Sequence, residues 1–419
     1  MLILNRTSLS GSDEGQLQVN VTNARNNFPI ENASISILEE SAPETIIEQL
    51  TTNSSGQTEN VDLAAPPPEY SQEPDSPRPY SEYTILVQAE GFESVEVQGS
   101  EILPGVLSLQ PIRMIPLSQA LPPEENIQIP DHTLYGTYPP KIPEDEIKPT
   151  GQSGEIVLSR VVVPETIVVH DGVPSDSSAR DYYVSYRDYI KNVASCEIYA
   201  TWPESALIAN LLAIMSFTLN RVYTEWYRNQ GYDFTITSST AYDQKWVYGR
   251  NIFQEISVLV DDLFNQYLSR PNVKQPLFTQ YCDGRRVTCP NWLSQWGSKY
   301  LGDRGYSPIQ ILRNYYGSSI YINSAEQIAG IPSSWPGYSL TIGSSGAKVR
   351  QMQNQLNTIA TAYSAVPMLV EDGIFGPRTA QSVRVFQSVF GLPVTGVVDF
   401  STWYRISQIY VGIARLAEL

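Results

Sequence analysis

The chain has 419 residues, of which 42% are hydrophobic, and its 27 Lys and Arg against 44 Asp and Glu give a formal net charge of −17. A net negative charge disfavours binding to nucleic acid and to anionic membrane surfaces, because both are polyanions. No apolar run is long enough to span a bilayer, and the N-terminus lacks the apolar core of a signal peptide, so we expect neither membrane insertion nor a leader.

The charge is divided sharply along the chain. Residues 1–150 hold 6 Lys and Arg and 23 Asp and Glu, a net of −17, whereas residues 151–419 hold 21 of each. Such an asymmetry indicates that the N-terminal region is a functionally separate piece. The neutral remainder suits a polymer that is held through hydrogen bonds and stacking.

Residues 1–118 consist of short runs in which apolar and polar residues alternate. The alternation is clearest in Leu17–Val21, Ala33–Ile37 and Tyr83–Ala89, with turn-rich gaps between the runs. Period-two alternation of this kind predicts an antiparallel β-sandwich.

Three segments of this region resemble the transthyretin-like or carboxypeptidase-regulatory fold, which implies no chemistry of its own; they are Gly15–Ile37, Thr52–Gly56 and Ala89–Phe92. Residues 119–155 follow and include the Pro-rich stretch Leu121–Pro149. We predict an extended linker there.

Two acids compete for a chemical role near the start of a long predicted helix. Apolar residues at three- and four-residue steps from Leu207 to Trp226 predict an amphipathic helix that faces a core. Thr201 and Glu204 have the spacing of a capping box, which gives Glu204 a structural task. Glu197 has no such task, and its apolar neighbours would desolvate it and raise its pKa toward the range of a general acid.

The run Tyr189–Leu207 resembles, without a gap, the start of the catalytic region of the sporulation stage II protein D (SpoIID/LytB) family, whose members cleave peptidoglycan glycan strands. In this resemblance the catalytic acid falls on Glu197. The similarity continues in four further motifs: Tyr242–Gln244, Tyr248–Gly249, Ser294–Ser298 and Leu312–Gly317. It implies an α+β catalytic domain over residues 156–332. Gln280–Arg286 departs from the family pattern where some relatives have a metal site.

Elimination favours an acid that works without a metal or cofactor. Only two histidines occur, His132 and His170, and the chain has no Cys-x-x-Cys, so a hydrolytic zinc centre is not expected. Cys282 and Cys289 could form a hairpin disulfide, bind a metal or stay free.

A glycosidase needs two carboxylates, whereas a lytic transglycosylase needs one acid, because the sugar's own C6 hydroxyl closes the anhydro ring. One well-placed acid, Glu197, fits the second scheme, with Asp243 and Asp283 as open candidates for a base. Sugar sites combine aromatic platforms with amide groups. We therefore predict that Tyr199, Gln295 and Trp296 line the cleft, with Gln295 reaching an N-acetyl group.

Residues 337–419 resemble the peptidoglycan-binding type 1 domain, a module of three helices. Asp372–Thr379 forms a glycine-dependent turn that enters a helix with Pro377 at its first position, and Thr395–Trp403 loosely repeats the turn. We expect Asp372 and Phe375 to contact the wall polymer.

Taken together, these patterns predict a multidomain α+β protein with an N-terminal β-sandwich, a central SpoIID-like catalytic domain and a C-terminal three-helix domain. The same order resembles the SleC-type spore cortex-lytic enzymes. That resemblance implies a lytic transglycosylase of spore cortex glycan strands, located in the spore cortex or coat and made in the mother cell. It also implies a zymogen that a subtilisin-like germination protease cuts between Pro149 and Val163. The alternatives are a muramidase or amidase, or a non-catalytic wall-binding protein that activates an autolysin.

Overall fold

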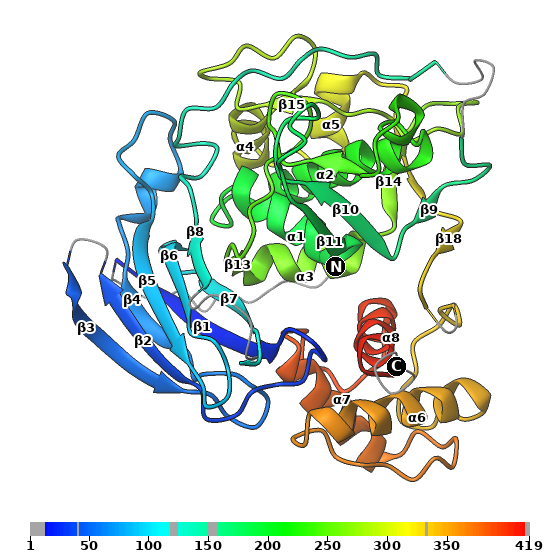
Figure 1. Ribbon diagram of the computed structural model, residues 1–419. Helices are drawn as coiled ribbons and strands as arrows, with labels where there is room; N and C mark the ends of the chain where they lie inside the picture. Colours follow the sequence, from blue (N-terminus) through cyan, green and yellow to red (C-terminus); the bar gives the residue numbers. More distant parts are fainter. Residues whose placement is uncertain (1–12, 40–41, 118–124, 150–156, 332–333, 415–419) are drawn as a thin grey trace.

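The structure is a computed structural model that describes residues 13–39, 42–117, 125–149, 157–331 and 334–414. Three parts follow one another along the chain: a β-rich N-terminal part, a central part of helices and short strands, and a helical C-terminal part (Figure 1). Of the predicted linker and cut region, residues 119–124 and 150–156 lie outside the described residues.

The N-terminal part consists of two β-sheets around one apolar core. The first sheet has the order β13-β7-β1-β4, with bounds β1 Glu14–Asn23, β4 Val61–Ala64, β7 Leu107–Met114 and β13 Ile252–Phe253. The second has the order β3-β2-β5-β6-β8, with bounds β2 Ser34–Glu39, β3 Ala42–Thr51, β5 Ser81–Gln88, β6 Val95–Ile102 and β8 Glu125–Gln128. Side chains of a strand alternate between its two faces, so Leu17, Val19 and Val21 all point into this core and are fully buried.

The central part places a small sheet and four helices around one long helix. The sheet has the order β11-β10-β12, with bounds β10 Thr166–His170, β11 Asp181–Ser185 and β12 Ile236–Thr237. The helices are α1 Tyr186–Glu197, α2 Glu204–Tyr223, α3 Gln254–Leu263, α4 Gln295–Asp303 and α5 Pro308–Tyr316. Short strand pairs complete this part: β14 Gln266–Ser269 with β17 Tyr321–Ser324, β15 Tyr281–Cys282 with β16 Leu293–Ser294, and β9 Val162–Val163 with β18 Gln327–Ile328.

The long helix α2 is buried on nearly all sides rather than amphipathic. Helices α1, α3, α4 and α5 and strand β14 all pack against it. It is long and apolar enough to cross a membrane by composition, but 89% of its apolar window is buried inside the protein. The three- and four-residue spacing predicted a helix here, and the structure has one. The spacing did not predict that neighbouring elements would cover its polar face as well.

The capping box predicted at Thr201 and Glu204 is wrong. Helix α2 begins at Glu204 after Pro203, and no side chain caps its N-terminus. The Thr201 hydroxyl instead donates to Ser71 Oγ of the N-terminal part at 2.8 Å. A contact between two parts of the chain therefore takes precedence over the local cap.

The C-terminal part contains three helices, α6 Ala347–Ala362, α7 Pro377–Val389 and α8 Phe400–Ala414. Gly376 precedes α7 and Pro377 is its first residue, as predicted. Gly373 and Gly396 both have positive φ, +75° and +74°, at the two repeated turns. The Gly373 N–H donates to Gln353 and the Gly396 N–H donates to Gln387, at 2.8 Å in both cases. The two turns that repeat in the sequence are therefore held by the same kind of hydrogen bond.

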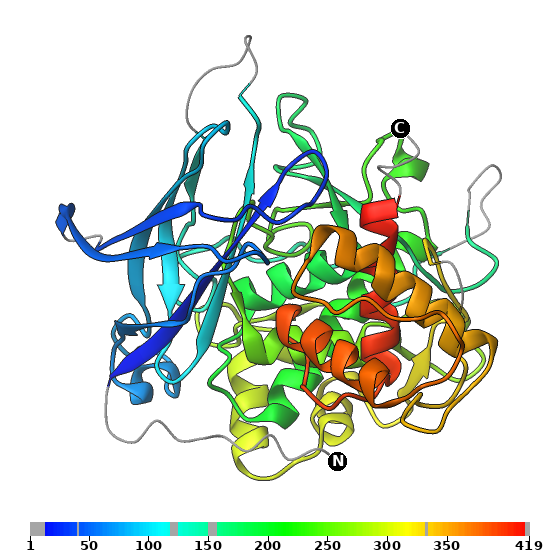
Figure 2. The same ribbon diagram turned by 90° about the horizontal axis from the view of Figure 1, so that it is seen from below.

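The three parts are joined by hydrogen bonds and by a shared sheet edge. Figures 1 and 2 show from two sides how the parts lie against one another. Strand β13 of the central part pairs antiparallel with β7, which extends the first N-terminal sheet. Arg250 donates to both carboxylate oxygens of Glu101, and both side chains are 1% exposed. Arg250 Nε also donates to Ser195 O in helix α1 at 2.9 Å.

We expect Glu101→Gln to lower the free energy of unfolding by about 3–5 kcal/mol, because it leaves the buried Arg250 guanidinium without its counter-ion. The matched control is Asp75→Asn, which removes an exposed ion pair to Arg285 between the same two parts and should cost about 1 kcal/mol or less. Denaturant unfolding of the full chain measures both. Equal losses of unfolding free energy in the two variants would show that the buried ion pair contributes no more than the exposed one.

Candidate active site

Glu197 is the last residue of helix α1 and is 4% exposed. The backbone N–H of Lys245 donates to its Oε1 at 2.9 Å. The Gln295 amide donates to its Oε2 at 3.1 Å and to its carbonyl oxygen at 2.9 Å. A helix C-terminus is an unfavourable place for a carboxylate, and these two donors hold it there in one orientation.

Three sequence-distant segments therefore meet at Glu197: the end of α1, the segment after Gln244 and the start of α4. They lie in or directly after three of the motifs singled out in the sequence, Tyr189–Leu207, Tyr242–Gln244 and Ser294–Ser298. The contribution of Lys245 could not be read from its side chain, because only its backbone N–H takes part.

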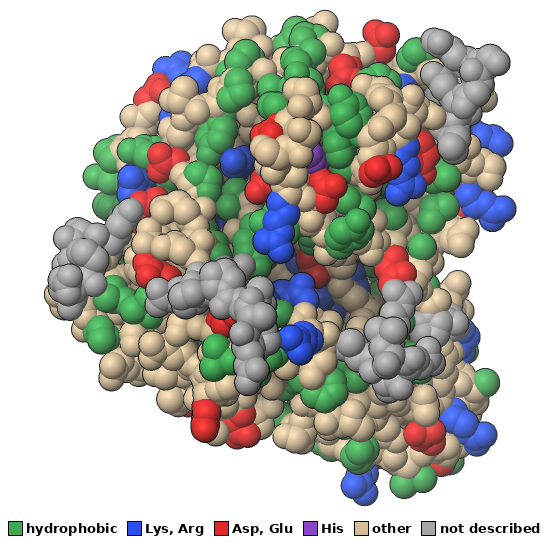
Figure 3. All heavy atoms as spheres, in the orientation of Figure 1, with side chains coloured by type: hydrophobic (Ala, Val, Ile, Leu, Met, Phe, Trp, Pro, Cys, Tyr) green, Lys and Arg blue, Asp and Glu red, His purple; other side chains and the backbone are tan. Residues whose placement is uncertain are grey.

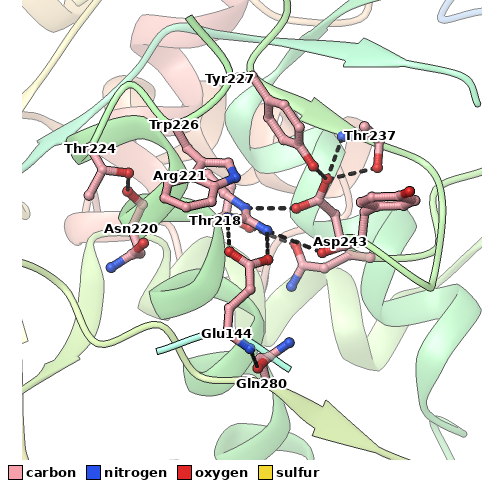
Figure 4. A network of polar contacts seen from close by, with 12 residues as sticks. Glu144, Thr218, Asn220, Arg221, Thr224, Trp226, Tyr227, Thr237, Asp243 and Gln280 are labelled. Carbon is pink, nitrogen blue, oxygen red and sulfur yellow. Dashed lines mark hydrogen bonds and ion pairs between the residues drawn. The ribbon is translucent and has the colours of Figure 1, made fainter. Parts of the chain in front are cut away.

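Asp243 holds the Lys245 segment in place and is saturated with hydrogen bonds. Its carboxylate accepts from Arg221 Nε, the Tyr227 hydroxyl and the Thr237 hydroxyl, at 2.6–2.7 Å, and from the Thr237 N–H at 3.0 Å (Figure 4). It has no exposed surface. In this conformation Asp243 serves the structure and is not placed to act as a base.

Asp283, the other candidate base, is also engaged. Its carboxylate accepts from the backbone N–H groups of Arg285, Arg286 and Val287 at 3.0–3.2 Å. These bonds close the turn that follows β15. Glu197 and Asp283 both line the pocket described below, but the three N–H donors of Asp283 all belong to its own turn.

A segment of the N-terminal part crosses this pocket. Residues 129–149, which we call the strap, contain neither helix nor strand and pack against the central part. The Thr133 hydroxyl donates to Cys196 O at 2.8 Å, and the His132 ring lies 4.4 Å from that of Tyr199. Burial lowers the pKa of His132 well below its usual value, so this ring packs as a neutral aromatic group.

Lys141 is a strap residue that lines the pocket at Glu197. Its ammonium donates to the carbonyl oxygens of Asp243 and Thr240 and lies 4.8 Å from the centre of the Tyr281 ring. Burial lowers the pKa of Lys141, and the nearby carboxylates of Glu197 and Asp243 oppose that shift. This buried amine and Glu197 line the same pocket.

Glu144 of the strap forms an ion pair with Arg221. Arg221 Nη1 and Nη2 donate to Oε2 and Oε1 of Glu144 at 3.0 and 2.6 Å, and Lys148 Nζ donates to Oε2 at 2.7 Å. Burial acts to raise the pKa of Glu144, but the hydrogen bonds and charges of Arg221 and Lys148 hold it below its ordinary value. Burial lowers the pKa of Lys148 to about 8.

The strap leaves only a small space at Glu197. The pocket there has a volume of about 60 Å³ and is lined by strap residues Tyr138, Pro139, Pro140 and Lys141 together with Glu197. Ligand pockets commonly have about 300–1,000 Å³. A sugar does not fit while the strap is in place, so the described state is closed.

The other predicted cleft residues surround Glu197 but are covered. Tyr199 is 2% exposed and lies under His132 of the strap. Gln295 is 2% exposed and its amide is engaged with Glu197. Trp296 is half-buried and packs 5.0 Å from the Trp202 ring.

The C-terminal site predictions lie far from this pocket. Phe375 has no exposed surface and fills the core of its domain, so its side chain offers no surface to a ligand. Asp372 accepts from the Ile374 N–H at 2.8 Å and from the Gln353 amide at 3.0 Å, which places its carboxylate within the glycine turn.

Cys282 and Cys289 form a disulfide, with Cα atoms 5.7 Å apart. This selects one of the three states that the sequence left open. Burial raises the pKa of the free Cys196 thiol to about 12. Within the part of the chain that the structure describes, no group of three or more His, Cys, Asp or Glu side chains is placed to hold a metal ion.

A larger hollow is separate from Glu197. It has a volume of about 800 Å³ and lies between the three parts, and Figure 3 shows Lys and Arg side chains in it. Its walls include Tyr182, Tyr248, Arg187, Lys191 and Arg405. Its size depends on how the parts are docked, and Glu197 is not among the residues that line it.

Comparison with known proteins identifies the C-terminal region. Residues 345–406 match the family described as "Putative peptidoglycan binding domain". A zinc D-Ala-D-Ala carboxypeptidase of Streptomyces albus G is 39% identical over 75 residues, which are 18% of this chain and 28% of that protein. The chain thus spans little more than a quarter of that relative's length.

Two solved structures each match a short part of the chain. The N-terminal domain of SleB is 30% identical, with a TM-score of 0.15, over 17% of this chain and 93% of that one. A 5-hydroxyisourate hydrolase of Klebsiella pneumoniae is 16% identical, with a TM-score of 0.17, over 25% of this chain and 92% of that one. The family match is the finding that supports a cell-wall-related protein with a peptidoglycan-binding type of domain.

We expect the double variant Cys282→Ser and Cys289→Ser to lower the free energy of unfolding by about 2.5 kcal/mol, because the crosslink restricts a short loop in the unfolded chain. Thermal unfolding of the wild type with and without a reductant should show a loss of similar size. The double variant itself should be insensitive to the reductant. A wild-type protein that is equally stable in both conditions would contradict the predicted contribution of the disulfide.

Proposed function

We propose that the protein is a lytic transglycosylase of spore cortex peptidoglycan, with Glu197 as its acid, and that it is held inactive by its strap. The observation that carries this proposal is the fixed carboxylate of Glu197 at the base of a pocket that the strap closes. The match of the C-terminal region to a peptidoglycan-binding family supports peptidoglycan as the substrate.

The reaction needs one proton that is given and then taken back. Glu197 donates a proton to the glycosidic oxygen, and the bond between that oxygen and C1 of the N-acetylmuramic acid breaks. The C6 hydroxyl of the same sugar then attacks C1 and returns its proton to Glu197, which closes a 1,6-anhydro ring without water. General acid catalysis of this kind contributes about 10²–10⁴-fold.

A hydrolase would need a second carboxylate to activate a water or to attack C1. Asp243 and Asp283 were the candidates, and the hydrogen bonds of both are taken up by structural partners. This observation favours the one-acid scheme over a muramidase. It also favours an enzyme over a wall-binding scaffold, since a scaffold has no need to orient Glu197 with two donors.

The inhibitory element of the proposed zymogen is the strap. The sandwich itself contacts the central part at Arg250 and Thr201, whereas strap residues line the pocket at Glu197. A subtilisin-like protease that cuts between Pro149 and Val163 would sever the strap from the catalytic part. Residues 150–156 of that stretch lie outside the described residues. Location in the spore cortex or coat, after synthesis in the mother cell, belongs to the same proposal.

We expect Glu197→Gln to reduce cortex cleavage by about two to four orders of magnitude, because the amide cannot donate the proton. The assay uses the full chain after limited proteolysis near residues 149–163, with mass spectrometry of the released fragments. The wild type should produce 1,6-anhydro ends, which are one water lighter than hydrolytic ends. Glu204→Gln is the matched control, since Glu204 is exposed and caps nothing. Full activity of Glu197→Gln would disprove the assignment.

We expect Glu144→Gln to raise the activity of the uncut chain at least about tenfold, because it removes a charged contact of the strap, and tenfold corresponds to about 1.4 kcal/mol of docking free energy. Asp145→Asn makes the same chemical change at the adjacent, exposed strap residue and should leave the uncut chain inactive. Turbidity loss of decoated spores measures both. If neither variant differs from the wild type, while proteolysis activates the protein, the strap is not what blocks the site.

A further inference from the structure

The guanidinium of Arg221 is shared between two carboxylates that belong to different parts of the chain. Its Nε donates to Asp243 of the central part at 2.7 Å, and its two outer nitrogens donate to the two oxygens of Glu144 in the strap (Figure 4). Paired N–H···O bonds from one guanidinium to one carboxylate are specific in geometry as well as strong. Arg221 thus presents its planar fork to whatever occupies the position of Glu144.

Two glutamines beside this fork bind the amide groups of the strap. Gln280 donates to Ile142 O at 2.7 Å and accepts from the Glu144 N–H at 2.9 Å. Gln275 accepts from the Lys148 N–H at 2.7 Å and donates to the Lys148 carbonyl at 3.1 Å. Each glutamine uses both its donor and its acceptor, which is how a side chain recognises an amide. The cleft therefore offers amide partners on both sides of a carboxylate partner.

The charges that remain around Arg221 after the strap leaves indicate what the site would bind. When the strap leaves, Glu144 and Lys148 leave together, and Arg221 keeps Asp243 as its counter-ion. The pair of Arg221 and Asp243 is neutral and stays folded into the central part, and Nη2 keeps the Tyr242 carbonyl oxygen as an acceptor. The two N–H groups that donate to Glu144 lose that acceptor, and a charged acceptor that both can bind at once competes best with water. A carboxylate is the matching occupant.

We propose that Arg221, Gln280 and Gln275 form a subsite that binds a carboxylate flanked by amides on the wall polymer, and that Glu144 of the strap occupies this subsite as an internal substitute. This inference rests on the proposed function, because it requires the strap to leave. The chemistry is that of muramic acid, whose lactyl group or attached peptide supplies the carboxylate. N-acetylglucosamine alone lacks that group.

The subsite and the acid are close enough to act on one substrate. Arg221 donates to the carboxylate of Asp243, and Glu197 accepts from the N–H of Lys245, two residues further along the same segment. Two residues of extended chain span at most about 7 Å, so one short segment holds both the subsite and the acid. A muramic acid residue bound at Arg221 would therefore orient a neighbouring glycosidic bond toward Glu197.

The first experiment asks whether the Arg221 fork accepts an external carboxylate. In the full chain, Glu144→Ala leaves a space for a small molecule, and acetate and acetamide differ only in charge and one donor group. We expect acetate to bind this variant at least tenfold more tightly than acetamide does, as measured by the shift of the melting temperature at matched ionic strength. The wild type and Asp145→Ala should not discriminate between the two. Equal binding of acetate and acetamide, or the same preference in Asp145→Ala, would overturn the proposal.

The second experiment identifies the source of the carboxylate. Glu197→Gln protein cut near residues 149–163 is titrated with N-acetylmuramic acid, N-acetylmuramoyl-L-alanine and N-acetylglucosamine. We expect one of the two acids to bind at least tenfold more tightly than N-acetylglucosamine. Preference for the first assigns the lactyl carboxylate, and preference for the second assigns the peptide carboxylate. Equal binding of all three would overturn the subsite.

The two proposals fail separately. Full activity of Glu197→Gln removes the proposed reaction and leaves the binding measurements unchanged. Loss of activity in Glu197→Gln together with equal binding of the three sugars removes the subsite alone.

Discussion

The buried guanidinium of Arg221 is the constraint on which the site depends. A charge without exposed surface must be paired, and Arg221 has no exposed side-chain surface. Asp243 provides the pairing from within the central part, and this fixes the segment that leads to Lys245. The Lys245 N–H then holds the Glu197 carboxylate. A structural ion pair in the core thus determines the orientation of the proposed acid.

The same reasoning distinguishes the strap from the sandwich. Arg221 has a second carboxylate in its own domain, so the strap can leave without stranding a buried cation. Arg250 has Glu101 of the sandwich as its ion-pair partner, and both groups are buried. Loss of the whole N-terminal part would break that buried ion pair, which is costly. Under the proposed function, we therefore expect the strap to be released and the sandwich to remain docked after a cut.

Sequence reasoning grouped Glu197 with Gln295 but did not predict what covers them. Glu197 and Gln295 lie in short motifs whose resemblance to a known family could be read directly, and the structure brings them within hydrogen-bonding distance. Helix α2 could be predicted from the periodicity of its apolar residues, and the turns of the C-terminal part from the positions of their glycines. The strap could not be predicted, because it has no periodicity and its partners, such as Gln280, are more than a hundred residues away. The capping box failed because Thr201 found a partner in another part of the chain.

The docking of the C-terminal part bears on how a wall polymer would be presented. Gln57 of the sandwich donates to Val389 O, Gln254 of α3 to Gly391 O and Arg187 of α1 to Tyr404 O. A binding domain on a flexible tether raises only the local concentration of a substrate. One that is fixed against the catalytic part also limits the direction from which a strand can approach. Because two of these three contacts belong to the central part, that restriction persists when the strap has been released.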